Sequence, residues 1–455
     1  MITRIIQCIL LIACCLSGAN VVTIGPNKEF RLNDKPFFPI MQWLQNDFLI
    51  TSETQYGINL FAVPGNSVPA KNWCDTAKAH GVYACCSWNA GDVASVVNHA
   101  GFFGWFFGDE PDLQSNAVPP DSIGCQYQRI KSADANHVAF LTITAAFYSK
   151  QSLPAWVNGK DSVYYEYPKF SDAIGFDHYP VYGWCRPDWI YQVGDAQTEL
   201  VRKYAKGQKS TCQWIECVKT SGQWCSIPAR GTNDGPYDYE IENETWLAII
   251  HGANAIGYFT HSWKCPGYSQ FCISDTQGIM LKKVNGRITA LTNVLCSADA
   301  PDSIKTSITG VGGSSGRVDV KAKILGDSLY LIAASVLNMT GAADSQHVAF
   351  TVPGVSSSIA VLFENRNLIP SGNTFSDGFG LRSSVRIYAM KTGPAHVSRN
   401  SAGRAAVLSR SGLNQAIFDM QGRRIDKEVL RNGQTGVYIF KNAGGCRILL
   451  SPMAR

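Results

Sequence analysis

The sequence contains 455 residues, of which 45% are hydrophobic and only 16% are charged, and its formal net charge is +5. A chain of this length has room for one large domain and smaller modules, since a usual domain has roughly 100 to 200 residues. The low fraction of charged residues excludes an intrinsically disordered chain and argues against a general nucleic-acid-binding protein.

The positive charge is concentrated near the C-terminus. Residues 401–455 contain nine Lys or Arg residues and three Asp or Glu residues, a net of +6, and Arg4 adds one more. Residues 20–400 therefore sum to −2. A nearly neutral main body has no basic face that would attract phosphate groups, so we expect a neutral partner.

The first 19 residues have the pattern of a signal peptide. Arg4 supplies the positive charge, residues 5–16 are apolar, and the small residues 17–19 form a cleavage site before Asn20. We therefore expect export, to the outside or to the cell surface. Residues 11–14 also fit lipoprotein processing, with lipid attached at Cys14. No later run reaches the roughly 18 apolar residues that a transmembrane helix needs.

The cysteines suit an oxidising compartment. Three of the 15 Cys residues lie in the leader, which leaves an even number for disulfides. Close pairs that could join loops are Cys217 with Cys225 and Cys265 with Cys272. The adjacent Cys85 and Cys86 lie in an apolar run and are expected to be free core thiols. Neither a CxxC pair nor a Cys/His cluster at ligand spacing occurs, so we expect no metal and no cofactor.

Between residues 20 and 299, short β-like runs alternate with helical segments, which predicts repeated βα units and a parallel sheet. Eight such units over about 260 residues are typical of a (β/α)8 TIM barrel. The expected strands are residues 39–43, 58–63, 82–88, 102–108, 138–144, 173–177, 211–216 and 255–260. The expected helices are residues 70–80, 121–135, 190–206, 241–251 and 278–296.

The remainder of the chain has a different pattern. Residues 300–393 contain alternating strands, at 317–322, 329–334, 347–352, 359–363 and 385–389, which predict a β-sandwich. Residues 394–410 read as a linker. Residues 411–455 then form a short β-rich module, for which we expect an address or interaction role.

Two predicted barrel strands end in carboxylates. The fourth strand leads into Asp109-Glu110-Pro111-Asp112, and the seventh ends in Glu216. Catalytic groups of TIM barrels lie at the C-terminal ends of strands, so we expect Glu110 and Glu216 to face each other across the barrel mouth. The alternatives are a buried ion pair or, for the two Asp residues, a helix N-cap.

Two facing carboxyl groups are what glycosidic bond cleavage requires, because one protonates the leaving oxygen while the other attacks the anomeric carbon or activates water. This arrangement resembles clan A of the glycoside hydrolases, a superfamily of retaining enzymes on (β/α)8 barrels. The resemblance implies that Glu110 is the acid/base and Glu216 the nucleophile. The clan usually has Asn before the acid/base, where this sequence has Asp109, the residue implied to contact the sugar.

Further residues carry the resemblance. The segment Gly175-Phe176-Asp177-His178-Tyr179-Pro180 after strand six matches a common feature of the clan, an aromatic hydroxyl near the nucleophile. The segment His261-Ser262-Trp263 after strand eight matches another, a Trp floor under the sugar. His178 is expected either to contact substrate or to be structural. Residues 300–393 look like the accessory β-domain that often follows such barrels, and residues 411–455 are similar to the C-terminal sorting domains of type IX secretion.

All 11 Trp residues lie between residues 43 and 263. Indole faces stack on the C–H faces of sugar rings, so this concentration favours carbohydrate binding. Candidates at strand ends are Trp43, Trp88 and Trp263, and candidates in loops are Trp184 and Trp224. Trp105, inside the fourth strand, is expected in the core.

Together these features predict a secreted, retaining endo-β-glycanase that acts as a monomer on a neutral polysaccharide, such as a β-glucan, without a cofactor. One alternative is a non-catalytic carbohydrate-binding or surface protein on a degenerate barrel. Another is a transglycosylase that uses the same two Glu residues. The outer-membrane secretion machinery is a further expected partner, through the C-terminal module.

Overall fold

The computed structural model describes residues 19–391, apart from 114, 116, 150–161, 221–224, 226–234, 266, 301–306 and 356, and the backbone of four short strands between residues 416 and 450. The expected leader, with Cys14, lies outside the described residues except for its last position. Residues up to 397 form one compact unit and the residues after them a second. In the described part, no helix has both the length and the apolar character needed to cross a membrane.

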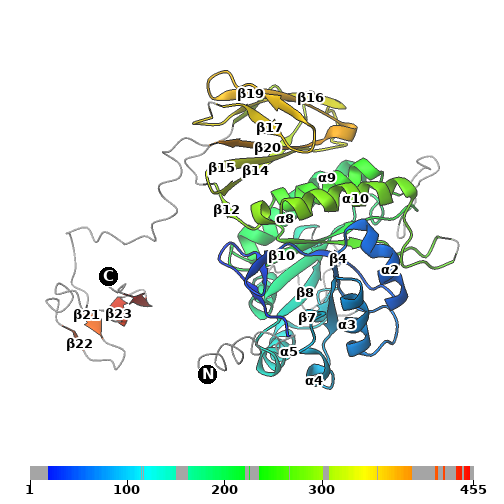
Figure 1. Ribbon diagram of the computed structural model, residues 1–455, viewed down its shortest axis with the longest axis vertical. Helices are drawn as coiled ribbons and strands as arrows, with labels where there is room; N and C mark the ends of the chain where they lie inside the picture. Colours follow the sequence, from blue (N-terminus) through cyan, green and yellow to red (C-terminus); the bar gives the residue numbers. More distant parts are fainter. Residues whose placement is uncertain are drawn as a thin grey trace, which may run out of the picture. The chain divides into compact units, whose positions relative to one another are not determined.

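Eight parallel strands close into a barrel, as predicted (Figure 1). Each strand pairs with the next one along the chain, and the eighth pairs with the first. The strands are β4 (Ile40–Gln42), β5 (Leu60–Phe61), β6 (Tyr83–Ser87), β7 (Phe102–Asp109), β8 (Val138–Thr144), β9 (Ala173–Asp177), β10 (Ser210–Glu216) and β11 (Ala255–Phe259).

Side chains of these strands alternate between two cores. Phe103, Phe140 and Trp214 pack together inside the barrel, whereas Trp105 and Ile215 belong to the layer between strands and helices. Strands buried on both faces explain why the sequence runs are almost wholly apolar. Trp105 is fully buried, as predicted.

A small antiparallel sheet that the sequence did not reveal lies against the N-terminal end of the barrel. It consists of β1 (Val22–Ile24), β2 (Phe30–Leu32) and β3 (Lys35–Phe37). Phe30 of this sheet stacks on Phe140 inside the barrel, with ring centroids 5.4 Å apart. The sheet covers that end with apolar side chains, which leaves the C-terminal ends of the strands as the open mouth.

The predicted helices lie outside the strands. They are α3 (Ala70–Ala79), α5 (Pro120–Ala133), α8 (Tyr191–Glu199), α9 (Asp238–Ile250) and α10 (Asp275–Ala290). Residues Leu200–Tyr204 continue α8 as a π-helical segment, and α11 (Thr292–Leu295) follows α10. Shorter helical segments are η1 (Asp47–Leu49), α2 (Ile50–Glu53), η2 (Thr54–Tyr56), α4 (Val93–Val96), α6 (Ala146–Ser149), α7 (Ser162–Glu166), η4 (Tyr167–Phe170), η5 (Pro187–Trp189) and η7 (Leu381–Ser383).

A β-sandwich follows the barrel, as predicted. One sheet has the order β12-β14-β15-β20-β17-β18 and the other β13-β16-β19. The strands are β12 (Ala298–Asp299), β13 (Ser307–Thr309), β14 (Val318–Leu325), β15 (Ser328–Ser335), β16 (Ser345–Thr351), β17 (Ile359–Val361), β18 (Arg366–Leu368), β19 (Thr374–Gly380) and β20 (Val385–Lys391). Helix α9 packs against this sandwich, and the side-chain amide of Asn243 donates to the Ser335 carbonyl oxygen at 2.7 Å. Contact on both sides explains why 11 residues of α9 are buried.

The second unit contains one antiparallel sheet in the order β22-β21-β23-β24. Its strands are β21 (Ala416–Phe418), β22 (Arg424–Ile425), β23 (Val437–Asn442) and β24 (Gly445–Leu450). This β-rich content agrees with the sequence pattern. Its role as a sorting module stays a prediction.

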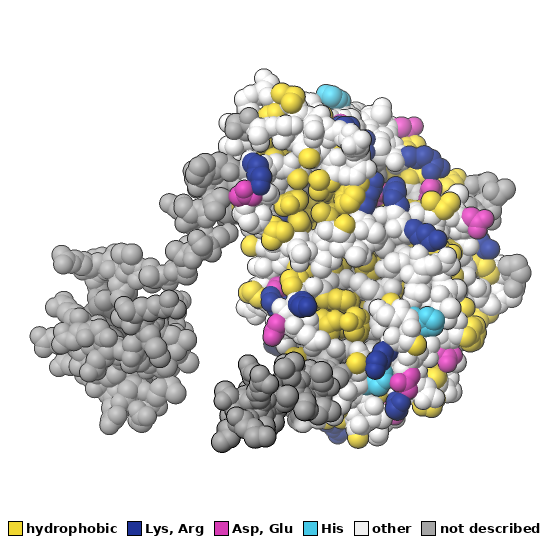
Figure 2. Space-filling model, viewed as in Figure 1, with side chains coloured by type: hydrophobic (Ala, Val, Ile, Leu, Met, Phe, Trp, Pro, Cys, Tyr) yellow, Lys and Arg dark blue, Asp and Glu magenta, His cyan; other side chains and the backbone are white. Residues whose placement is uncertain are grey.

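Charged side chains are scattered over one face of the first unit. On the face shown in Figure 2, Lys and Arg side chains lie singly or in small groups among acidic and uncharged ones. The pattern agrees with the near-zero charge of residues 20–400.

Candidate active site

Two adjoining cavities open at the mouth of the barrel, and both are lined by Glu110, Asp177 and Tyr179. The smaller has a volume of about 150 Å³ and the larger about 350 Å³. The smaller is also lined by Trp43, Asp109, Thr142, Trp214, Phe259 and Trp263. The larger is also lined by Leu113, Thr144, Ala145, Ala146, Ser149, His178, Gly183 and Trp184. The carboxyl groups therefore meet where the two cavities join.

Glu110 follows directly after β7 and has a left-handed backbone, with φ of +46°. This conformation is unfavourable for a residue with a side chain and is often found at functional sites. Two hydrogen bonds hold it: its amide donates to the Thr142 carbonyl at 2.8 Å, and its carbonyl accepts from the Leu113 amide at 2.9 Å. The surrounding backbone thus fixes the direction in which Glu110 leaves the strand.

Asp177 is the last residue of β9, and its carboxyl group lies close enough to that of Glu110 for the two to interact directly. Burial, and then the neighbouring carboxyls of Glu110 and Asp109, raise the pKa of Asp177 well above its usual range. Two carboxyl groups in such contact favour holding one proton between them. The sequence motif contained Asp177, but only its neighbours His178 and Tyr179 were expected to act on the substrate.

The other two acids of the Asp109-Glu110-Pro111-Asp112 motif have different surroundings. Asp109 lines the smaller cavity, where partial loss of solvation and, next, the charge of Glu110 raise its pKa to about 7. Asp112 is fully buried and accepts hydrogen bonds from the Thr144 amide at 2.8 Å and from the Thr144 hydroxyl at 2.6 Å. Asp112 is therefore a structural residue that supports the segment after β8.

Glu216 ends β10, as predicted, but lines neither mouth cavity. Its side chain is 0% exposed, and its two carboxylate oxygens accept from the backbone amides of Val181 at 2.6 Å and Tyr182 at 2.5 Å. Burial raises its pKa to about 8, against the lowering effect of these two hydrogen bonds. The expectation that Glu216 faces Glu110 across the mouth is therefore not met, because the loop after β9 covers Glu216.

Several aromatic candidates meet at the cavities. Trp43, Tyr179 and Trp263 line the smaller cavity, and Trp184 lines the larger. The exposed fractions of Trp184 and Trp263 are 42% and 53%, which leaves ring faces free at the rim.

Trp214, a residue that sequence reasoning did not select, belongs to the wall of the smaller cavity. Its indole N–H donates to the Thr142 hydroxyl at 3.0 Å, and its ring centroid lies 5.2 Å from that of Trp43. Trp214 lies two positions before Glu216 on β10, so strand alternation was a signal that it points into the barrel.

Other candidates are placed differently. Trp88 lines a groove along α5 and packs on Trp105, with centroids 5.0 Å apart, so it is not brought to the mouth. Trp224 lies outside the described residues. His178 is 2% exposed, and burial lowers its pKa to about 4, which leaves a neutral imidazole at the larger cavity.

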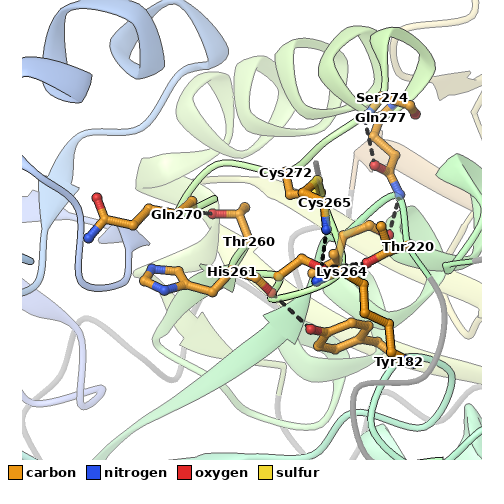
Figure 3. The surroundings of a disulfide bond; sticks show 12 residues. Tyr182, Thr220, Thr260, His261, Lys264, Cys265, Gln270, Cys272, Ser274 and Gln277 are labelled. Carbon is orange, nitrogen blue, oxygen red and sulfur yellow. Dashed lines mark hydrogen bonds between the residues drawn. A yellow bond between two sulfur atoms is a disulfide. The ribbon is translucent and has the colours of Figure 1, made fainter. Parts of the chain in front are cut away.

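Two disulfides join the loops around the mouth. Cys185–Cys225 connects the loops after β9 and β10, and Cys265–Cys272 closes the loop after β11 (Figure 3). The second pair agrees with the sequence expectation. The expected partner of Cys225 was wrong, because Cys217 points into the core as a free, buried thiol. Cys85 and Cys86 are free and buried, as predicted.

Polar contacts hold the loop after β11 near the mouth. Figure 3 shows the Tyr182 hydroxyl donating to the His261 carbonyl oxygen, at 3.0 Å. This bond ties the loop that covers Glu216 to the segment that carries Trp263. Among the described residues, no group of three His, Cys, Asp or Glu side chains is arranged to hold a metal ion.

No family model and no curated protein matches the chain. Several solved structures resemble it at low identity. An endo-1,4-β-mannanase from Eisenia fetida is 14% identical, with a TM-score of 0.38, over 59% of this chain and 96% of that one. A GH30 endoxylanase from Clostridium papyrosolvens C71 is 11% identical, with a TM-score of 0.37, over 82% and 100%. An Anoxybacillus α-amylase is 8% identical, with a TM-score of 0.46, over 76% and 90%. Likenesses this distant carry no argument about the reaction.

Proposed function

We propose that this protein is a glycoside hydrolase in which Glu110 and Asp177 form the reacting pair. The observation that carries the proposal is the meeting of these two carboxyl groups where two aromatic-lined cavities join, each cavity being lined by both residues. One buried, proton-sharing carboxyl pair provides both the acid and the carboxylate that glycosidic cleavage needs.

The spacing of the pair supports a retaining reaction. Inverting enzymes hold their carboxyl groups roughly 6.5–9.5 Å apart to leave room for a water molecule, whereas retaining enzymes hold them about 5–5.5 Å apart. Glu110 and Asp177 interact directly, which agrees better with the shorter of these two separations.

The proposed cleavage has two chemical steps. Glu110 donates the single proton that the pair shares to the glycosidic oxygen, so the leaving sugar departs as an alcohol and Asp177 is left as a carboxylate. The Asp177 carboxylate attacks the anomeric carbon and forms an ester. The Glu110 carboxylate next takes a proton from water, whose oxygen attacks the same carbon and displaces Asp177 as carboxylate, so that both groups return to their starting states.

The walls of the cavities favour a neutral sugar chain. Trp43, Trp214 and Trp263 offer ring faces in the smaller cavity, and Trp184 extends this surface along the larger. Among the residues that the structure describes, no Lys or Arg side chain lines either cavity. We therefore propose a neutral, β-linked polysaccharide as substrate, cut within the chain because the rim tryptophans are exposed on both sides of the pair.

Purified protein incubated with a panel of neutral and acidic polysaccharides tests the proposal through released reducing ends. We expect release from at least one neutral β-glycan, lost in Glu110→Gln and in Asp177→Asn and kept in Asp75→Asn, a surface carboxylate paired with Lys71. Full activity in either of the first two variants would refute the assignment of the pair.

We also propose export, because the first 19 residues have a signal-peptide pattern. The mass of the mature N-terminus tests it. Cleavage before Asn20 supports a secreted form, a lipid-modified Cys14 supports surface anchoring, and an intact Met1 in the cytoplasm contradicts both.

A further inference from the structure

A separate cavity of about 330 Å³ lies at the opposite end of the barrel from the mouth. Lys209 and Asn254, at or just before the starts of β10 and β11, form its barrel wall. Its other wall comes from the sandwich, through Asp299 of β12 and through Lys321 and Lys323 of β14. Residues of both domains therefore enclose this cavity.

The charges around this cavity are strongly unbalanced. Four lysines line it, Lys28, Lys209, Lys321 and Lys323, against one acid, Asp299. Asp299 already forms ion pairs with two of them, with Nζ–O distances of 2.5 Å to Lys321 and 3.0 Å to Lys323. Its single negative charge leaves three positive charges uncompensated by any lining residue.

The two remaining lysines form no ion pair with any residue that the structure describes. The Lys209 ammonium donates to the Ser171 carbonyl oxygen at 2.8 Å, and the acid whose charge acts on it, Asp172, is already paired with Lys131 at 3.0 Å. Lys28 forms no ion pair with any residue that the structure describes. Burial lowers the pKa of Lys209 and of Lys323, in keeping with ammonium groups that have lost solvent without gaining enough opposite charge.

We propose that this cavity binds a small oxyanion with two negative charges, a phosphate or sulfate group. Ammonium groups are compact donors that bind such oxyanions as point charges. The volume is about ten times the roughly 30 Å³ that a water molecule occupies in the liquid, so the group has room for an attached sugar-sized substituent. The site lies apart from the carboxyl pair and does not depend on glycoside hydrolysis.

Binding at this place has a mechanical consequence. Lys209 belongs to the barrel, whereas Lys321 and Lys323 belong to the sandwich, so one bound anion is held by both domains. A ligand that binds only the folded, docked arrangement stabilises it. The bound oxyanion should therefore raise the unfolding temperature of the whole first unit.

Calorimetric titration of the full chain with inorganic phosphate, sulfate and a hexose 6-phosphate, at constant ionic strength set with NaCl, tests the proposal. We expect saturable binding at one site and an unfolding temperature that rises with ligand concentration. Tighter binding of the hexose phosphate indicates an esterified ligand, and equal binding indicates the free oxyanion. Either order supports the site, and the absence of saturable binding for all three ligands overturns it.

Substitutions of residues that line the cavity test whether the oxyanion binds there. Lys209→Met and Lys28→Ala should each weaken binding at least tenfold, and Lys28→Ala breaks no described hydrogen bond, so it should fold. Asp299→Asn should strengthen binding, because it removes the competing carboxylate. Lys282→Ala, on the exposed side of α10, should leave binding unchanged. Unchanged affinity in both Lys28→Ala and Lys209→Met would overturn the proposal, whatever the outcome of the polysaccharide panel.

Discussion

The carboxyl groups of Glu110 and Asp177 reach one another from strand ends that are separated by a single strand, β8. Backbone pairing sets this relationship: the Glu110 amide bonds to Thr142 of β8, and Asp177 pairs with Thr144 of the same strand. Both acids are thus held by the sheet, which places them with the precision that acid–base chemistry requires.

Removal of either carboxyl group should abolish most of the activity. Glu110→Gln and Asp177→Asn keep the size of the side chain but remove the shared proton, and we expect kcat to fall about 10²- to 10⁴-fold. Initial rates on the polysaccharide identified in the panel measure the effect. Unfolding curves of each variant serve as the control, since a variant that has unfolded says nothing about the reaction.

The pH dependence of activity should respond to Asp109. The negative charge of Asp109 helps to raise the pKa of Asp177, so Asp109→Asn should lower that pKa. The proton shared with Glu110 is then lost at a lower pH, and the alkaline limb of kcat/KM moves toward acid. Profiles of the two proteins over pH 4–10 measure the shift. A limb that stays in place, or moves toward alkali, would show that Asp109 does not act on the pair.

Stability should also depend on pH through Glu216. Its folded pKa of about 8 lies above the usual value for Glu, so the folded state keeps a proton that the unfolded state loses. Stability from this group is therefore greatest below the unfolded pKa and falls as pH rises from about 4.5 toward 8, by up to about 1.4 kcal/mol per pH unit. Glu216→Gln should flatten this slope in urea unfolding between pH 5 and 8. An unchanged slope would contradict the raised pKa.

The comparison of Glu216 with Asp177 shows what the sequence could and could not reveal. Short apolar runs that alternate with helical segments predict all eight barrel strands, and the position of an acid at a strand end indicates Glu110. The same rule applies to Asp177, the last residue of β9, so this acid could have been selected from the sequence. The burial of Glu216 could not be predicted from the sequence. It depends on the amides of Val181 and Tyr182, which come from a loop about 35 residues earlier in the chain.

Other errors have similar physical causes. Trp88 follows β6 and shares the outward parity of Ala84 and Cys86, so its position at the end of a strand did not bring it to the mouth. The disulfide partner of Cys225 is set by loop packing, which spacing along the chain does not encode.

Two tryptophans should behave in opposite ways. Trp263→Ala removes an exposed ring from the smaller cavity, so we expect KM to rise about tenfold, which corresponds to about 1.4 kcal/mol. Trp88→Ala should leave KM unchanged and lower the free energy of unfolding by about 2 kcal/mol, because its ring packs on Trp105. Paired kinetic and unfolding measurements check both. A rise in KM for Trp88→Ala alone would contradict the placement of the two rings.

The disulfide between Cys185 and Cys225 should stabilise the mouth loops. It closes a segment of 40 residues, and loop-closure entropy predicts a contribution of about 4 kcal/mol. We therefore expect Cys185→Ser to lower the unfolding temperature. Cys217→Ser is the matched control, because Cys217 is a free thiol and the disulfide remains. A loss of the disulfide in Cys217→Ser, seen by peptide mapping, would contradict the observed pairing.

The most direct test of the central claim is the identity of the residue that becomes attached to sugar during the reaction. An activated 2-deoxy-2-fluoro glycoside of the sugar that the protein releases is used to trap the covalent intermediate. The labelled protein is then digested and analysed by mass spectrometry. We predict that the label lies on the peptide containing Asp177 and is absent in Asp177→Asn. A label on Glu216 would contradict the account, because it would require the loop over Val181 and Tyr182 to open and expose a carboxylate that the structure shows fully buried.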